Sequence, residues 1–195
     1  VRRFVVCCPF GIWSIRMMDI LKRINLLLEE EIAPNEIRSL IRRDCSKFLL
    51  ESKGLALYRG ELNSKEFSFK GTVRKDRKPK DMPVGATKIF NKEFEEVHKV
   101  ANIRNISLFA SGDSIEAEDY GKVYRIFPIG DYTYWWNSEV EDLYMKWKNK
   151  FDSTNKLFKK MAEGYKNTDL PQAIKSGNEI MFVCDEYYAI EANDY

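Results

Sequence analysis

Residues 179–190 read Glu-Ile-Met-Phe-Val-Cys-Asp-Glu-Tyr-Tyr-Ala-Ile, and this stretch contains two apolar segments separated by a short polar turn. Short apolar runs that are bounded by turn residues are typical of buried strands. We therefore predict two consecutive strands, over residues 179–184 and 186–190. The remaining elements must be compatible with this pair of strands near the end of the chain.

Further apolar runs before this stretch predict strands over residues 55–61, 106–110, 123–129 and 132–136. Apolar residues at helical spacing predict helices over residues 87–101, 115–120, 139–151 and 156–165, the third with a capping box at Ser138 and Glu141. A loop around Pro171 is expected to lead into the last two strands. Strands and helices interleave without a regular βαβ rhythm or an internal repeat. The predicted fold class is therefore α+β.

The first part of the chain predicts two helices. Asp19 is suited to cap the first, and Asn35 the second, whose apolar stripe continues to Leu49. Gly54 stands where a left-handed C-terminal cap belongs. We interpret residues 1–54 as an N-terminal helical lobe and residues 55–195 as the core domain.

The start of the chain carries a separate expectation. Its first residue is Val, and Met17 and Met18 precede the first good helix. We therefore expect residues 1–16 to be an untranslated extension that an over-long reading of the gene has added.

Composition excludes several classes of function. The 195 residues include one histidine, His98, which argues against a multi-histidine zinc site and leaves one residue that could serve as a histidine base. The four cysteines show no CxxC spacing, so we expect no disulfide framework and a reducing compartment. The formal net charge of +2 does not by itself indicate nucleic acid, and no apolar run approaches the ~18 residues of a membrane span.

Three segments each place one polar residue beside an apolar strand and near a glycine. They are Ala56-Leu-Tyr-Arg-Gly60, Leu108-Phe-Ala-Ser-Gly112 and Gly177-Asn-Glu-Ile-Met-Phe-Val183. A polar side chain at a strand end is positioned by the rigid sheet and can face a cleft. The candidate site residues are therefore Arg59, Ser111 and Glu179.

This order of motifs resembles the Arg-Ser-Glu branch of the ADP-ribosyltransferase superfamily, and in particular a phage-type member of that branch. The family carries an aromatic-Arg pair on its first core strand, as in Tyr58-Arg59-Gly60, and a Phe-x-Ser turn similar to Phe109-Ala-Ser111. A helix with Ala and an aromatic residue follows, like Ala117 and Tyr120. Its third motif, a Glu before two strands, is similar to residues 179–190.

The resemblance covers about residues 55–191 and implies a split β-sandwich core with NAD as co-substrate. Cleavage of the bond between nicotinamide and ribose develops positive charge on the ribose, and Glu179 would stabilise that charge. Arg59 would hold a phosphate or the adenine-side ribose, and Ser111 would orient Glu179 or the substrate. Gly60, Phe109 and Tyr120 complete the set of residues that the resemblance assigns to NAD binding.

The resemblance also bears on the acceptor of ADP-ribose. Gln172, Lys175 and Gly177 lie in the segment with which this family recognises its target. Arginine-modifying members have Glu or Gln where this chain has Gly177, so a protein or a nucleic acid remains open as acceptor. The other large branch has a histidine on the first strand, where this chain has Arg59. A cytoplasmic location follows, in the host cytoplasm if a phage encodes the protein.

Two other classes of function remain open. The same fold could serve as a non-catalytic interaction protein or a virion-associated component. A nucleic-acid-binding module is the second alternative, because residues 70–80 form a basic loop that follows Phe67 and Phe69. The same loop could instead contact the phosphates of NAD, or it could be solvated and bind nothing.

Overall fold

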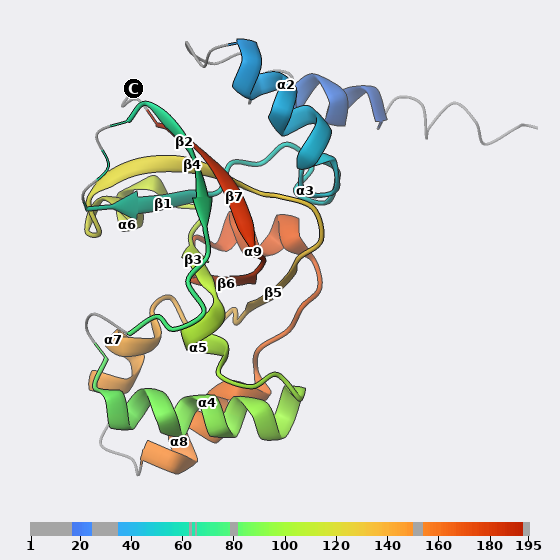
Figure 1. The fold of residues 1–195 in the computed structure, drawn as a ribbon. Coiled ribbons are helices and arrows are strands. Elements are labelled where there is room, and N and C mark those ends of the chain that lie inside the picture. The colour runs from blue at the N-terminus through green and yellow to red at the C-terminus, as the bar shows by residue number, and fades with distance from the viewer. Residues whose placement is uncertain are drawn as a thin grey trace, which may run out of the picture.

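The computed structural model describes residues 17–24, 35–62, 64, 66–78, 82–149 and 154–192. Figure 1 shows two β-sheets in the middle of the molecule, with helices α2 and α3 at one end and α4 and α8 at the opposite end. The expectation for residues 1–16 lies outside the described residues. Residues 17–24 are helical, which confirms the first predicted helix, but Asp19 lies within that helix and is not its N-cap.

The larger sheet has four antiparallel strands in the order β1-β4-β7-β2. Their bounds are β1 (Tyr58–Glu61), β2 (Ser68–Thr72), β4 (Lys122–Pro128) and β7 (Glu186–Glu191). Strand β2 includes the first residues of the predicted basic loop at 70–80, where no strand was expected, and it pairs with β7 at the other end of the chain. That long-range pairing cannot be read from local sequence.

The smaller sheet has three antiparallel strands in the order β3-β6-β5. Their bounds are β3 (Leu108–Ala110), β5 (Thr133–Trp136) and β6 (Ile180–Val183). The predicted strands at these places are confirmed, although the observed ones are shorter. Mixed helices and antiparallel sheets confirm the α+β class.

Both faces of the smaller sheet are buried. Alternate residues of a strand point to opposite faces, and in β6 the residues on each face join an apolar cluster. Ile180 and Phe182 of β6 join the apolar cluster that also contains residues of the larger sheet. Met181, between them, joins a second cluster with Phe90 and Phe158 of the helices on the other side. The sheet therefore lies between the larger sheet and a helical layer.

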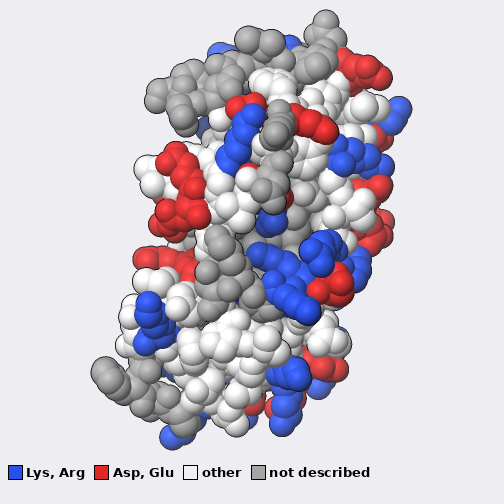
Figure 2. Space-filling view, turned by 60° about the vertical axis from the view of Figure 1, so that its left-hand side comes forward, with Lys and Arg blue, Asp and Glu red and all other residues white. Residues whose placement is uncertain are grey.

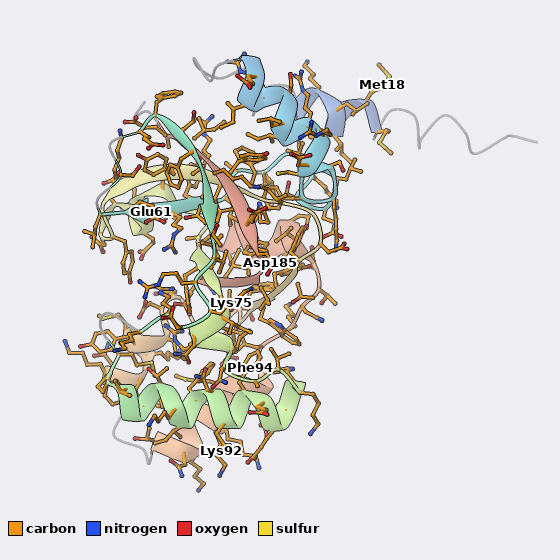
Figure 3. All side chains as sticks on the ribbon, in the orientation of Figure 1. Met18, Glu61, Lys75, Lys92, Phe94 and Asp185 are labelled. Atoms are coloured by element: carbon orange, nitrogen blue, oxygen red, sulfur yellow. The ribbon has the colours of Figure 1, made fainter. Side chains whose placement is uncertain are left out.

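The helices that follow β2 cover the far side of the smaller sheet or connect the strands. They are α4 (Val84–His98), α5 (Ile103–Ile106), α6 (Ser114–Glu118), α7 (Leu143–Lys148), α8 (Thr154–Glu163) and α9 (Leu170–Ser176). Helix α4 is amphipathic: Figure 3 shows Phe94 on its side toward the sheets and Lys92 on its outer side.

Two expectations for these helices are wrong. The helix predicted over residues 139–151 begins only at Leu143, and its N-cap is Asp142, whose side chain accepts a hydrogen bond from the Met145 backbone N–H. The segment around Pro171, which the sequence assigned to a loop, forms α9. Proline is well suited to the first turn of a helix, where its missing N–H has no partner to lose.

The N-terminal helices pack into the same apolar cluster as the sheets. The second predicted helix is divided at Cys45 into α2 (Asn35–Asp44) and α3 (Ser46–Glu51), and Gly54 has the predicted left-handed conformation, with φ of +70°. Phe48 of α3 is fully buried. Its ring centroid lies 6.2 to 6.3 Å from those of Phe127, Tyr132 and Phe182.

We expect Phe48→Ala to lower the free energy of unfolding by about 3–5 kcal/mol, because it leaves a cavity between α3 and both sheets. Leu50→Ala is the control, since Leu50 is on the same helix and half exposed. Urea denaturation of both variants measures the difference. Equal, small losses would contradict the placement of α3 in the core.

Candidate active site

A β-bridge joins the two sheets, and the candidate site is built around it. Ser111, just after β3, pairs with Tyr58 of β1 through two backbone hydrogen bonds of 2.7 and 2.9 Å. In the antiparallel register of β3 with β6, Ala110 is opposite Ile180. Ser111 and Glu179 are the residues that directly follow and precede this pair along the chain. The junction therefore brings the Arg59, Ser111 and Glu179 segments to one place.

A cavity of about 400 Å³ opens at this junction. Seven of the residues expected at the site line it: Arg59, Gly60, Phe109, Ser111, Tyr120, Gly177 and Glu179. Gln172 and Lys175 on α9 do not. Gln172 is exposed at the surface, whereas Lys175 lines a neighbouring hollow that shares Tyr58 and Gly177 with the main cavity.

Glu179 forms a two-pronged ion pair with Arg104 of α5. The guanidinium donates from Nη1 to Oε1 over 2.8 Å and from Nη2 to Oε2 over 3.3 Å. The side chains are only 12% and 9% exposed. Sequence reasoning did not predict Arg104, because a single arginine in a polar turn before a strand carries no signal of its partner.

Burial sets the ionisation of this pair. It raises the pKa of Glu179 above its ordinary value, and the positive charge of Arg104 opposes that rise. Burial lowers the pKa of Arg104, but the charge of Glu179 and its hydrogen bonds outweigh burial, so the pKa is raised overall. Arg104 is therefore a permanent cation, and it orients the carboxyl group of Glu179.

Arg59 connects the two sheets through its guanidinium group. Nε donates to Oε1 of Glu61 over 2.6 Å, and Nη1 donates to the backbone carbonyl of Phe109 over 2.8 Å. The hydroxyl of Tyr187 donates to the same Glu61 oxygen over 3.2 Å. Figure 3 shows Glu61 at the end of β1. These contacts fix the guanidinium plane of Arg59 in the cavity wall.

The side chain of Ser111 contacts backbone groups in the structure. Its hydroxyl donates to the backbone carbonyl of Gly177 and accepts a hydrogen bond from the Asp113 backbone N–H. It therefore holds the turn after β3 against the end of α9 instead of contacting Glu179. Gly177 has φ of +72°, the left-handed conformation that ends α9 and favours glycine.

Gly60 and Gly112 are explained by close backbone approach. A Cβ at Gly60 would collide with the carbonyl oxygen of Ala117 in α6, and one at Gly112 would collide with that of Ile174 in α9. The glycine beside each polar strand end thus lets a helix pack directly against the junction. This close approach explains why the residue at position 60 of the cavity wall is a glycine.

Two arginines pack on Phe109. Cζ of Arg77 lies 4.2 Å from the ring centroid and Cζ of Arg104 lies 4.6 Å from it, both within cation–π range. Arg77 belongs to the basic loop, so guanidinium groups cover the ring of Phe109, which the resemblance assigns to NAD binding. The composition of the loop was a signal for Arg77, but nothing local distinguished it from its neighbours.

Carboxylates form another part of the cavity wall. Glu116, Glu141 and Asp142 line it, and the hydroxyl of Tyr120 donates to Asp142 over 3.4 Å. Burial and the neighbouring acids raise the pKa of Glu116. The cavity is therefore electrically divided, with arginines around Phe109 and carboxylates near α6 and α7.

The other basic residues of the loop are largely paired with acids. The pairs are Lys70–Glu186, Arg74–Asp76 and Lys75–Asp185, at 2.7, 3.4 and 3.0 Å. Figure 2 shows Lys and Arg side chains gathered at mid-height of one face, and Figure 3 shows Lys75 and Asp185 at that height. Less positive charge is available to a polyanion than the composition of the loop indicated.

Comparison of the chain with protein-family models, with curated proteins and with solved structures finds no match. Within the described residues, the helices lack the length and apolar character that crossing a membrane requires.

We expect Arg104→Met to lower the free energy of unfolding by about 3–5 kcal/mol at pH 7, because it leaves the Glu179 carboxylate buried without its partner. Without Arg104, the pKa of Glu179 is raised further. Between the unfolded and folded pKa values only the native state holds the proton, so stability falls as pH rises. The deficit should therefore shrink between pH 7 and pH 5.

Urea denaturation at both pH values measures this deficit. Lys92→Met is the control, since Lys92 pairs with Glu96 at the surface of α4 and its loss should change stability little. A deficit that is the same at pH 5 and pH 7 would show that Glu179 does not carry the unpaired charge.

Proposed function

We propose that the protein is an NAD-dependent ADP-ribosyltransferase that transfers ADP-ribose to a protein or nucleic-acid acceptor and releases nicotinamide. One observation carries the proposal: Arg59, Ser111 and Glu179, which the motifs selected from three distant segments, line one cavity. Its volume of about 400 Å³ lies in the range of small-molecule sites.

The arrangement of the sheets supports the same proposal. A split β-sandwich needs two separate antiparallel sheets, and the Arg59 strand belongs to the larger sheet while the strands beside Ser111 and Glu179 belong to the smaller one. We therefore extend the proposal to an ADP-ribosyltransferase-like core. The N-terminal helices contribute Phe48 to that core.

The reaction breaks the bond between ribose C1′ and the nicotinamide nitrogen, and the bonding electrons leave with nicotinamide. Positive charge develops on the ribose, as in glycoside hydrolysis. Glu179 would accept a hydrogen bond from the ribose 2′-hydroxyl and stabilise that charge. Arg104 uses one direction of each carboxylate oxygen, and a carboxylate has about four acceptor positions, so capacity for a hydroxyl remains.

The other parts of the wall have complementary roles. Arg59, fixed by Glu61 and the Phe109 carbonyl, would hold a phosphate or the adenine-side ribose. The carboxylates near α6 and α7 suit the positively charged nicotinamide ring. Tyr120 would supply a flat surface beside them. Ser111 would act by shaping the junction and not by touching the reacting atoms.

The acceptor would approach from the side of α9. The hollow lined by Lys175 and Gly177 adjoins the main cavity and provides a place next to it for a macromolecular surface. A nucleophile of the acceptor would attack ribose C1′ and lose its proton. Gly177 ends a helix and offers no side chain to position an arginine, so the acceptor residue is left open.

We expect wild-type protein to release nicotinamide from NAD, with label from the ADP-ribose part transferred to components of a cell lysate. Glu179→Gln should lower the rate about 100-fold or more, because the neutral amide does not stabilise the positive charge of the transition state. Glu163→Gln is the matched control, since the same change lies at the exposed end of α8.

The thermal stability of the protein in NAD separates an enzyme from a non-catalytic binder. A ligand at about 100 times its dissociation constant adds about 2.7 kcal/mol to the stability of the native state. A raised melting temperature without nicotinamide release would support the interaction protein. If the folded protein shows no thermal shift in NAD and no turnover, the transferase proposal is wrong.

A further inference from the structure

Two guanidinium groups in the cavity wall have incompletely used hydrogen-bonding capacity. Arg77 and Arg104 both contact Phe109, and Nη1 of Arg77 and Nε of Arg104 are buried with no hydrogen-bond partner among the described residues. Buried donors without partners are uncommon in folded proteins, and like charges on one ring repel each other. The arrangement therefore favours an additional, anionic occupant.

Arg77 also lacks a counter-charge of its own. Arg59 is paired with Glu61 and Arg104 with Glu179, whereas among the described residues no carboxylate lies within ion-pairing distance of Arg77. Burial, together with repulsion from Arg59 and Arg104, lowers the pKa of Arg77 to about 10, and the smaller opposing effects of the more distant Glu179 and Glu61 do not compensate. A desolvated cation without a partner destabilises the ligand-free protein.

The backbone holds Arg77 in this unfavourable position. Its N–H donates to the carbonyl of Asn105 over 3.1 Å, and the side-chain amide of Asn105 donates to the carbonyl of Arg77 over 2.7 Å. Asn105 is the residue directly after Arg104 in α5. The segment that carries one arginine thus fixes the other, so both guanidinium groups are preorganised before any ligand arrives.

We infer that Arg77 and Arg104 form a phosphate-binding subsite that receives the pyrophosphate group of NAD. The identity of this ligand rests on the proposed function. Phosphate oxygens would accept hydrogen bonds from the planar guanidinium groups and supply the negative charge that Arg77 lacks. Phe109 separates the two groups and holds their planes. Arg104 would then connect the phosphate subsite with Glu179, which it already orients.

The test uses ADP, which carries a pyrophosphate but no nicotinamide and therefore binds without turnover. Calorimetric titration of the full chain should give a dissociation constant about 10- to 100-fold higher for Arg77→Gln than for wild type. Arg74→Gln, at an exposed position three residues earlier, should remain close to wild type. The ligand-free melting temperature of Arg77→Gln should equal or exceed that of wild type, because an unpaired buried charge is gone.

Three results of these binding and melting experiments would overturn the subsite. These are absence of ADP binding to wild type, unchanged ADP affinity in Arg77→Gln, and a ligand-free melting temperature of that variant well below wild type, which would make Arg77 a structural residue. The transferase is judged separately. ADP binding that depends on Arg77 without nicotinamide release removes the transferase and keeps the subsite. If Arg77→Gln turns over NAD with the same KM as wild type, the transferase is supported and the phosphate subsite is wrong.

Discussion

Burial of both faces of the smaller sheet is the constraint on which the rest of the structure depends. Strand β6 has Ile180 and Phe182 in one apolar cluster and Met181 in the other, so no side chain along the strand is free for polar chemistry. Polar groups can therefore lie only at the strand ends. Glu179 and Ser111 occupy such ends, and the bridge to β1 brings Arg59 beside them.

The same burial makes the site electrostatically demanding. A carboxylate in this position has to be paired, and Arg104 supplies the partner from α5. Arg77 is the opposite case, because its backbone is fixed and its guanidinium forms no ion pair with a carboxylate in the described part of the chain. Groups held in unfavourable states are typical of functional sites, where a ligand completes the balance of charge.

Local sequence patterns were reliable where a signal and its cause lie within a few residues. The apolar runs gave the strands around Phe182 and Phe127, and Gly54 gave the left-handed end of the N-terminal helices. Local patterns were insufficient at Pro171 and at Ser138. A proline permits either a loop or a first helical turn, and two caps compete before α7, so packing decides between them.

The sequence by itself determined the α+β class and singled out Arg59, Ser111 and Glu179, because strand ends and glycines are local features. Only the tertiary structure decided that they share a cavity and that Arg104 pairs with Glu179. It also decided that the side chain of Arg77, in the basic loop, packs on the ring of Phe109. Those relations join segments up to 120 residues apart, from 59 to 179. Their geometry is set by the register and burial of the strands, which no single segment encodes.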